Sequence, residues 1–482
     1  MTDRLVVRRG SYYDSVTLML ASRDAEEVPG VQFAAAVTAT PVNMGLLASN
    51  GFDLSAEDLT PNDLVIAIRA DDDSAGDAAA VKVEARLAGE GDAVSTSAEH
   101  IPPRSFRSAT RRDPRLSLAI VSVPGRHAAY EVATALEAGL NVFCFSDGLS
   151  LDDEVALKRR ALERGLLMLG ADCGTAIIDG VALGFANVVR RGSIGVIGAS
   201  GTGIQEVTCL LDAAGAGISH AIGVGGRDLS AQVGGLMTIR ALELLAFDEG
   251  TRSIVLISNP PYPEVAATVA AAAARTGKPV VMGMLGPAAA VDAPAGVEVV
   301  RSLEQAAARG AEAAGATVVT HDADFPSRIT PGVIRGLFAG GSLCFEARDV
   351  VTAAGAAPGD SFVDYGEDEM TEGRAHPMID PWLRDEAFGR AAADPAVGAI
   401  IVDVVLGIGA HPDPAEHLAP RIGGALSERS DSLTVVAALC GTDRDPQDAS
   451  AQARRLVDAG ALVTRNAAHA ARLALAATRG SK

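Results

Sequence analysis

A glycine-rich turn between an apolar strand and a helix constrains this chain more than any other feature. Residues 192–207 read GSIGVIGASGTGIQEV. A strand, a glycine turn and a helix in succession are typical of α/β proteins, which hold anions at the amino-terminal end of such a helix. Ser200, Gly201, Thr202 and Gly203 supply hydroxyls and backbone N–H groups there, so we predict that they bind a phosphate or a carboxylate. Tight packing of the turn is the alternative interpretation.

The turn matches neither of two common nucleotide-binding patterns. No lysine follows its last glycine, so it is not a Walker loop, and its G-x-x-G-x-G spacing differs from the dinucleotide pattern. The anion that it binds is therefore not predicted to be a nucleotide.

The rest of the chain alternates apolar strand patterns with helical patterns, which predicts a mixed α/β fold with several parallel sheets. We expect a small α+β, ferredoxin-like module with an arginine-rich linker at residues 1–105 and a Rossmann-like domain at 106–190. Two flavodoxin-like parallel-sheet domains should follow at 191–328 and 329–482. The linker has five arginines: Arg104, Arg107, Arg111, Arg112 and Arg115. We interpret it as a solvated connector, and a clamp for an anion or an acidic partner is the alternative.

Composition excludes several classes of partner. The formal net charge of −20 and the aromatic content of 4% make nucleic acid and anionic membranes poor partners. The five cysteines lack the paired spacing of a zinc site, so we predict reduced core thiols and no metal. The start MTDRL has no signal-peptide core, and apolar runs are short, so we expect a cytoplasmic protein.

Several motifs carry a resemblance to known proteins. Residues 124–150, GADCGTAII at 170–178, the glycine turn and GVGG at 223–226 are similar in order to the α subunit of succinyl-CoA synthetase. The last domain resembles the C-terminal domain of that enzyme's β subunit. With FAGGSLC at 338–344 and DYGEDEMTEGRAHPMIDP at 364–381, the chain resembles the FdrA family.

The resemblance implies two activities. Family members are called acyl-CoA synthetases, and one branch is implied to be a subunit of oxamate carbamoyltransferase in purine (allantoin) degradation. The ligase's nucleotide module, its glycine-rich CoA loop and its phosphohistidine have no counterpart here; the last region reads GMLGPAA at 283–289. We therefore predict a carbamoyltransferase subunit. The alternatives are a subunit of a nucleoside-diphosphate-forming acyl-CoA synthetase, which would use CoA or a nucleotide, and a non-catalytic scaffold.

The resemblance also implies a phosphate held between the ends of two helices. One is the helix after the glycine turn, and we expect the other to follow the polar loop at 364–380. Within this picture His376 or Glu206 would move the proton, and Arg227 or Arg374 would hold the acceptor carboxylate. A solvated loop with a capped histidine, and a surface salt bridge for Arg227, are the alternatives.

Further candidates lie at predicted strand ends. Gly225 and Gly226 would let a ligand approach, and Asn259 before two prolines would face it, although a plain turn explains Asn259 equally well. Cys173 and His411 are expected to pack rather than to react. The expected partners are small anions (carbamoyl phosphate, phosphate, an oxamate-like acid) and partner subunits encoded alongside, in an oligomer.

Overall fold

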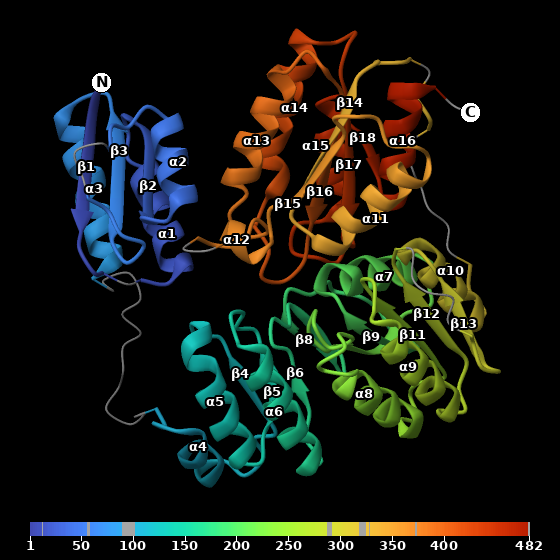
Figure 1. Cartoon of the computed structure of the whole chain (residues 1–482). Coiled ribbons are helices and arrows are strands. Elements are labelled where there is room, and N and C mark those ends of the chain that lie inside the picture. The colour runs from blue at the N-terminus through green and yellow to red at the C-terminus, as the bar shows by residue number, and fades with distance from the viewer. Residues whose placement is uncertain are drawn as a thin grey trace. The chain divides into compact units, whose positions relative to one another are not determined.

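The chain forms two compact units. The computed structural model describes residues 1–11, 13–54, 58–88, 102–286, 292–317, 324–326, 328–371 and 374–480 (Figure 1). The first unit comprises Met1–Pro102 and Glu367–Asp380, and the second comprises Pro103–Gly366 and Pro381–Lys482. In the described ranges, no helix combines the length and the apolar character needed to cross a membrane.

The first unit is a small α+β module. Its elements are β1 (Thr2–Arg8), α1 (Ser15–Glu26), β2 (Val31–Thr38), α2 (Pro41–Ser49), β3 (Leu64–Ala70), α3 (Asp73–Leu87) and α12 (Asp368–Thr371). The antiparallel sheet has the order β1-β3-β2. This order is that of the split βαβ unit in ferredoxin-like folds. A fourth strand is not found among the described residues of this unit.

Local chemistry explains where these helices begin. The carboxylate of Asp14 accepts a hydrogen bond from Thr17 N at 2.9 Å, and Asp72 accepts one from Ala75 N at 2.9 Å. Both residues are N-caps, which satisfy otherwise orphaned N–H groups. α1 and α3 bury apolar side chains such as Leu18 against one face of the sheet, and α2 packs on the other.

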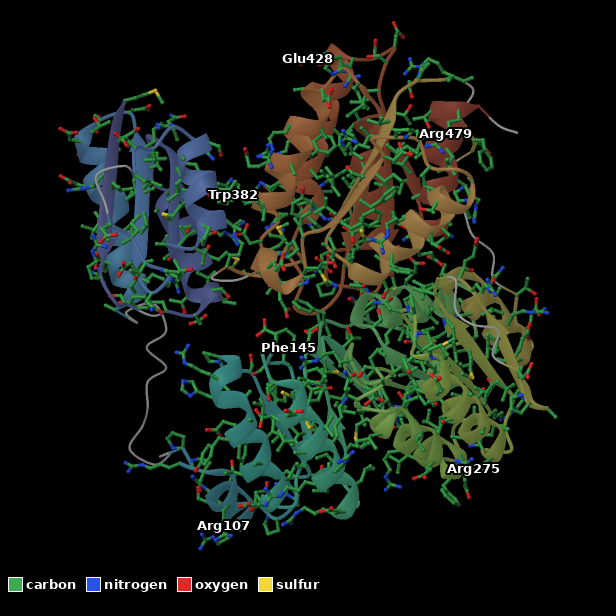
Figure 2. All side chains as sticks on the ribbon, in the orientation of Figure 1. Arg107, Phe145, Arg275, Trp382, Glu428 and Arg479 are labelled. Atoms are coloured by element: carbon green, nitrogen blue, oxygen red, sulfur yellow. The ribbon has the colours of Figure 1, made fainter. Side chains whose placement is uncertain are left out.

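The predicted connector at 89–115 contains a helix that the sequence interpretation missed. Residues 103–112 include α4 (Phe106–Arg112), and Ser105 and Ser108 form a capping box at its start. Arg107 points away from this helix (Figure 2). Residues 89–101 lie outside the described ranges, so the rest of the connector stays a prediction.

The second unit begins with a three-stranded parallel sheet of the order β4-β5-β6. Its elements are β4 (Leu118–Val121), α5 (Gly125–Glu137), β5 (Asn141–Cys144), α6 (Leu151–Glu163) and β6 (Met168–Leu169). This βαβαβ arrangement is the Rossmann-like pattern that the sequence predicts.

A seven-stranded sheet follows, with the order β13-β12-β11-β9-β10-β7-β8. Its elements are β7 (Thr175–Ile178), β8 (Val181–Gly184), β9 (Arg191–Ala199), α7 (Gly201–Ala213), β10 (Ile218–Gly223), α8 (Leu236–Phe247), β11 (Ser253–Ser258), α9 (Pro263–Arg275), β12 (Val280–Met284), β13 (Val297–Val300) and α10 (Leu303–Ala313). Strands β9 to β13 are parallel, and the β7–β8 hairpin adds antiparallel to β10. This sheet therefore extends across the boundary that we expect at residue 190, and the domain limits stay predictions.

The last sheet is fully parallel, with the order β15-β14-β16-β17-β18. Its elements are β14 (Val333–Phe338), α11 (Gly341–Ala353), β15 (Ser361–Asp364), α13 (Trp382–Ala393), β16 (Val397–Val405), α14 (Pro414–Glu428), β17 (Thr434–Cys440), α15 (Ala449–Asp458), β18 (Leu462–Thr464) and α16 (Ala467–Arg479). β16 is buried along its whole length, as a central strand covered on both faces must be. The predicted fold class, with parallel-sheet α/β domains and a small amino-terminal domain, is confirmed.

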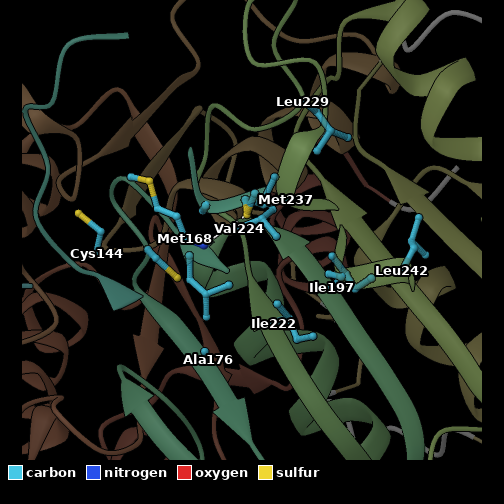
Figure 3. Packing of buried hydrophobic residues seen from close by; sticks show 14 of the residues in the cluster. Cys144, Met168, Ala176, Ile197, Ile222, Val224, Leu229, Met237 and Leu242 are labelled. Carbon is cyan, nitrogen blue, oxygen red and sulfur yellow. Dashed lines mark hydrogen bonds between the residues drawn. The ribbon is translucent and has the colours of Figure 1, made fainter. Parts of the chain in front are cut away.

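One apolar core joins the first two sheets of the second unit. Figure 3 shows Cys144 and Met168 from one sheet near Ala176, Ile197 and Ile222 from the other. All five side chains are buried. Burial of apolar surface stabilises the fold by about 25 cal/mol per Å², so this shared core holds the two sheets together.

Candidate functional site

The helix after the glycine turn begins where the sequence predicts. Ser200 is the N-cap of α7, and its Oγ accepts a hydrogen bond from Gly203 N at 3.0 Å. A Cβ on Gly198 would lie 2.5 Å from Ile204 Cγ1, and one on Gly203 would lie 2.8 Å from Ser200 Oγ. These two glycines therefore serve close packing of the turn. Ser200, Gly201 and Thr202 are half-buried at the end of the helix, so their donors remain accessible to a ligand.

A second helix meets this one end to end, and it is not the helix that we expect. The second helix is α11, whose N-cap Gly340 lies directly on Thr202: a Cβ there would come within 2.9 Å of Thr202 Cβ. The loop at 364–380 instead precedes α13, so the predicted location was wrong. The glycine turn that starts the second helix is the one in FAGGSLC, which directly follows β14. The sequence interpretation used this motif only for the family resemblance. β14 pairs with β16 at the centre of its sheet.

Hydroxyl groups bridge the two helix ends. Ser200 Oγ and Ser342 Oγ lie 2.5 Å apart, and Ser342 Oγ donates a hydrogen bond to Asn259 Oδ1 at 2.6 Å. We call the group formed by Ser200, Gly201, Thr202, Asn259 and Ser342 the cradle. Asn259 follows β11. The cradle residues therefore lie just after the carboxyl ends of three strands, β9 and β11 of the seven-stranded sheet and β14 of the five-stranded sheet.

The cradle favours a negative charge. The first N–H groups of α7 and α11 have no acceptor within their own helices, and each helix end carries a partial positive charge. Each end favours an exposed anion by about 0.3–1 kcal/mol, and by more when partly buried. Two such ends facing one point add their effects.

The buried carboxylate of Asp403 fixes the start of α11. Its oxygens accept hydrogen bonds from Ala339 N at 2.7 Å and Gly340 N at 2.8 Å. Arg384 Nη1 also donates to Asp403 Oδ1 at 3.1 Å, and both side chains are buried. Burial raises the pKa of Asp403, and the positive charge of Arg384 opposes that shift. This ion pair holds the turn before α11 in place.

Glu206 does not reach the cradle. Its side chain is buried within α7, and its Oε2 accepts a hydrogen bond from Ala467 N at 3.1 Å. Burial and the nearby carboxyl of Glu346 raise the pKa of Glu206 well above its usual range. The expectation that Glu206 moves a substrate proton is therefore corrected, because a side chain enclosed by helices cannot contact substrate.

His376 and Arg374 belong to the first unit, whereas the cradle belongs to the second. His376 Nδ1 accepts a hydrogen bond from Met378 N at 3.2 Å, and Arg374 Nε donates to Asn43 Oδ1 at 2.9 Å. Burial lowers the pKa of His376 to about 4, so its imidazole is neutral at pH 7. These contacts are those of the capped histidine that we weigh as the alternative.

Gly225, Gly226 and Arg227 lie outside the cradle. Gly225 has a φ of +87° and packs against the backbone of Ala171, so it serves the turn, while Gly226 faces open space. Arg227 Nε pairs with Glu154 Oε2 at 2.9 Å, which is the salt-bridge alternative. Neither the glycines nor the arginine contacts a cradle residue in the hydrogen bonds and ion pairs of the described ranges.

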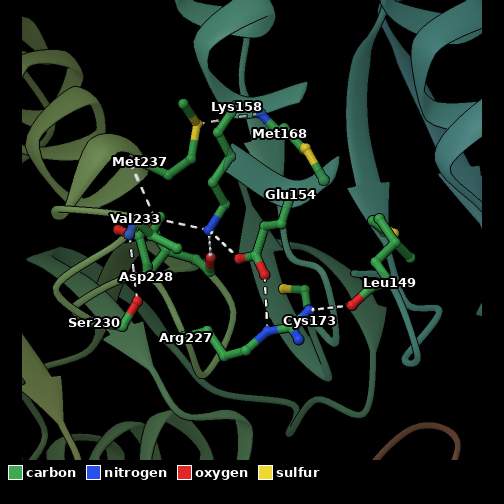
Figure 4. A network of polar contacts seen from close by, with 12 residues as sticks. Leu149, Glu154, Lys158, Met168, Cys173, Arg227, Asp228, Ser230, Val233 and Met237 are labelled. Atoms are coloured by element: carbon green, nitrogen blue, oxygen red, sulfur yellow. Dashed lines mark hydrogen bonds and ion pairs between the residues drawn. The ribbon is translucent and has the colours of Figure 1, made fainter. Parts of the chain in front are cut away.

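That salt bridge belongs to a buried network between α6 and the turn after β10 (Figure 4). Lys158 Nζ lies 2.8 Å from Glu154 Oε1 and 2.7 Å from Asp228 Oδ1, and it donates to Val224 O at 3.0 Å. The side chains of Lys158 and Glu154 are 0% exposed. The network is structural, because it connects the first two sheets of the second unit.

Cys173 and His411 pack, as the sequence indicates. Cys173 Sγ donates to Gly223 O at 3.4 Å, and burial raises its pKa to about 12. His411 Nδ1 accepts a hydrogen bond from Asp413 N at 3.1 Å. Neither residue is in contact with the cradle.

We expect the native protein to resist thiol alkylation. All five cysteines are free and buried, and burial keeps the Cys173 thiol protonated, whereas the thiolate is the reactive form. Iodoacetamide at pH 7.5, followed by mass spectrometry of the intact chain, should add no label within the time that labels the urea-unfolded chain fully. Rapid labelling of Cys173 in the folded protein would contradict this assignment.

The sequence interpretation missed Ser342, Thr175 and Glu346. Ser342 follows two glycines at a strand end, which is the signal that identified Ser200. Thr175 Oγ1 is buried without a hydrogen-bond partner among the described residues, and it would lie 3.3 Å from a Cβ on Gly201. Glu346 gives no signal in sequence, because its partner Glu206 is distant along the chain.

A hollow lies elsewhere on the second unit. It has a volume of about 250 Å³ and is lined by Ile177, Asn187, Val188, Arg190 and Ile218, among others. These residues lie near the amino-terminal ends of β9 and β10, opposite the edge that carries the cradle. We assign no function to this hollow.

Family models match three parts of the chain. Residues 1–102 match "AllF, heavy metal-associated domain", residues 189–286 match "CoA binding domain", and residues 337–477 match "CoA-ligase". The "Uncharacterized protein YahF" of Escherichia coli is 36% identical over 508 residues, which cover 98% of this chain and 98% of YahF.

Other similarities are shorter or structural. The "Succinate--CoA ligase [ADP-forming] subunit alpha 1" of Archaeoglobus fulgidus is 31% identical over 144 residues, which are 29% of this chain and 48% of that subunit. The dinucleotide-forming acetyl-coenzyme A synthetase 1 of Ca. Korarchaeum cryptofilum matches with a TM-score of 0.34 at 17% identity. That match covers 75% of this chain and 82% of the synthetase.

A heavy metal does not fit the first module. Soft metal ions prefer thiolate ligands, and residues 1–102 contain no cysteine and a single histidine, His100, outside the described ranges. The described residues also hold no group of three His, Cys, Asp or Glu side chains suited to a metal.

The start of one helix in the Rossmann-like part, outside the residues 189–286 that match the CoA-binding model, suits a phosphate group. α5 starts after β4 without a side-chain cap, and Arg126 and His127 lie in its first turn. An uncapped helix end beside an arginine provides N–H donors and a positive charge for a phosphate. Gly125 is required there for packing, since a Cβ would lie 2.5 Å from Asp147 O.

Proposed function

This chain belongs to the FdrA family, as its similarity to YahF over nearly its whole length shows, and we propose that it is an acyl-transfer subunit of the CoA-ligase type. Its cradle would bind the phosphate of an acyl phosphate. The observation that carries this proposal is the meeting of α7 and α11, with Ser200 Oγ and Ser342 Oγ 2.5 Å apart at the junction. Two aligned helix ends with hydroxyl donors suit a dianion better than any neutral ligand.

The proposed step is the transfer of an acyl group from its phosphate. The bond between the acyl carbon and the phosphate oxygen breaks, and charge develops on the leaving phosphate, which the N–H group of the half-buried Thr202 stabilises. Coenzyme A, when bound, supplies the thiol that forms the new carbon–sulfur bond, and the thiol proton passes to water. Arg126 and the start of α5 would hold a phosphate of CoA.

A second candidate is transfer of a carbamoyl group to a nitrogen, from the acyl phosphate carbamoyl phosphate to an oxamate-like acid. One observation favours it: residues 221–320 contain no histidine that could carry a phosphoryl group. The carbon–nitrogen bond forms as phosphate leaves, so the same cradle serves. We propose partner subunits and a cytoplasmic location for either reaction, and the buried free thiols suit a reducing compartment.

Sulfate binding tests the cradle without any need for turnover. Ser200→Ala removes the hydroxyl that contacts Ser342, and we expect sulfate affinity to fall about tenfold, as for the loss of one charge-assisted hydrogen bond. Isothermal titration calorimetry of the whole chain measures the affinity.

Ser150→Ala is the matched control. Ser150 caps α6, a helix of the three-stranded sheet rather than of the sheets that carry the cradle, and accepts a hydrogen bond from Asp153 N at 3.1 Å. It should cost stability like any lost cap and leave sulfate affinity unchanged. Equal affinities for the wild type and Ser200→Ala would refute the assignment of the anion to the cradle.

Two turnover assays separate the candidates. Acyl phosphate with CoA is offered in one and carbamoyl phosphate with oxamate in the other, each with and without co-expressed partner subunits. Thioester formation supports the ligase-type reaction, and phosphate release that requires oxamate supports the second candidate. Sulfate binding with neither turnover would favour a scaffold role.

A further inference from the structure

The two cradle helices are related by a reciprocal arrangement of buried carboxyl groups. Glu206 lies five residues after Gly201, the first residue of α7, and Glu346 lies five residues after Gly341, the first residue of α11. Both side chains are buried, at 1% and 2% exposure. The same position in each helix thus carries a carboxyl group that faces the other helix.

Each carboxyl group holds the end of a helix from the opposite sheet. Glu206 Oε2 accepts from Ala467 N at 3.1 Å, and Ala467 is the first residue of α16. Glu346 Oε1 accepts from Leu303 N at 2.6 Å, and Leu303 is the first residue of α10. The two contacts therefore cross the joint between the seven-stranded and five-stranded sheets in both directions.

The remaining oxygen of each carboxyl group is left without a hydrogen-bond partner among the described residues. Glu206 Oε1 and Glu346 Oε2 are buried and accept no hydrogen bond from any donor group in the described ranges. The carboxyl of Glu346 raises the pKa of Glu206, as a nearby like charge does. Two buried carboxylates in contact cannot both be ionised without a large cost.

We propose that Glu206 and Glu346 form a proton-sharing pair that couples anion binding at the cradle to proton uptake. The proposal rests on the proposed anion site. The pair lies about 8 Å along each helix from the cradle, at 1.5 Å per residue. A negative charge on the pair repels an anion at the helix ends, and little water lies between to screen it.

The surroundings decide where the pair titrates. The neighbours of Glu206 include the thiols of Cys440 on β17 and Cys209 on α7, and neither thiol carries a positive charge. The charged neighbours of Glu346 are Glu304 on α10 and Arg472 on α16. Arg472 is itself paired with Glu304 at 3.0 Å, so it neutralises Glu346 only in part. Burial raises the pKa of Glu346 to about 7, and that of Glu206 further above its usual range. The pair therefore gains negative charge as the pH rises through neutrality.

The charge on the pair determines how anion affinity changes with pH. Below pH 6 the pair is neutral and the anion binds to a positive helix junction. Above pH 8 the pair is negative, and anion affinity falls. Sulfate is the probe, because its charge stays at −2 across this range.

Calorimetric titration of the full chain with sulfate between pH 5.5 and 8.5 tests the coupling. We expect the affinity of the wild type to fall at least tenfold from pH 6 to pH 8.5, and that of the double variant Glu206→Gln, Glu346→Gln to change less than threefold. Glu243→Gln, an exposed carboxyl on α8, is the control and should follow the wild type.

A second measurement needs no variant. Titrations of the wild type at pH 7.5 in buffers of different ionisation enthalpy report protons taken up, and we expect net uptake on binding. Sulfate binding without proton uptake and with a flat pH profile would overturn the coupling and leave the anion site standing. No sulfate binding at any pH would instead overturn the proposed function and the coupling with it.

Discussion

Gly340→Val is expected to lower acyl-phosphate turnover by about 10²–10³-fold, the loss typical of a displaced transition-state donor. The backbone at Gly340 has a φ of −114° and tolerates a side chain, but the space does not. A Cβ would lie 2.9 Å from both Cβ and Cγ2 of Thr202, so the valine pushes the ends of α7 and α11 apart. Steady-state phosphate release by the subunit with its partners measures the change.

The control for this prediction is the same glycine-to-valine substitution at a position where the added side chain has open space. Gly389 lies on the exposed side of α13, and a Cβ there has no atom within 4 Å. Gly389→Val should leave turnover within about twofold, since valine is a better helix former than glycine. Similar activities for the two variants would mean that the helix junction does not bind the reacting phosphate.

Lys158→Met is expected to cost about 3–5 kcal/mol of unfolding free energy, the range for breaking a buried ion pair by removing one partner. Methionine fills similar space, but it removes the cation paired with Asp228 and leaves Glu154 with Arg227 alone, in a site where the lysine is 0% exposed. Urea denaturation followed by circular dichroism should show the transition of the second unit at a lower midpoint.

Arg160→Met provides the matched control on the same helix. Arg160 Nη2 pairs with Glu137 Oε1 at 2.6 Å, with side chains 39% and 45% exposed. Exposed pairs contribute about 0–1 kcal/mol because water screens them. If both variants shift the midpoint equally, the network around Lys158 does not hold the two sheets together.

The local elements could be read from the sequence because their causes are local. The helix predicted after the glycine turn is α7, which begins at Gly201 directly after its N-cap Ser200. Capping residues, strand periodicity and the glycine turn before α7 act within a few residues of where they stand. The cradle's first half, Ser200 to Thr202, was predicted for the same reason.

Contacts between distant segments escaped prediction. Glu154 and Lys158 are four residues apart on a helix, which in sequence is typical of an exposed pair, yet both are buried by Asp228 and the turn after β10. His376 was assigned to catalysis by its polar neighbours, and the structure instead shows it bonded within its own loop. The polar residues around a histidine in the sequence do not show whether it binds a substrate or accepts a hydrogen bond from its own backbone.

The sequence by itself determined the fold class, the family and one half of the cradle, since periodicity, turn chemistry and motif order are encoded within single segments. Tertiary structure alone decided which helix completes that site and which carboxyl groups meet behind it. Ser200 and Ser342 are far apart along the chain, and so are Glu206 and Glu346. Only the packing of α7 against α11 brings the members of each pair together. Pairing across such distances depends on the summed geometry of the intervening strands and helices, which no local pattern records.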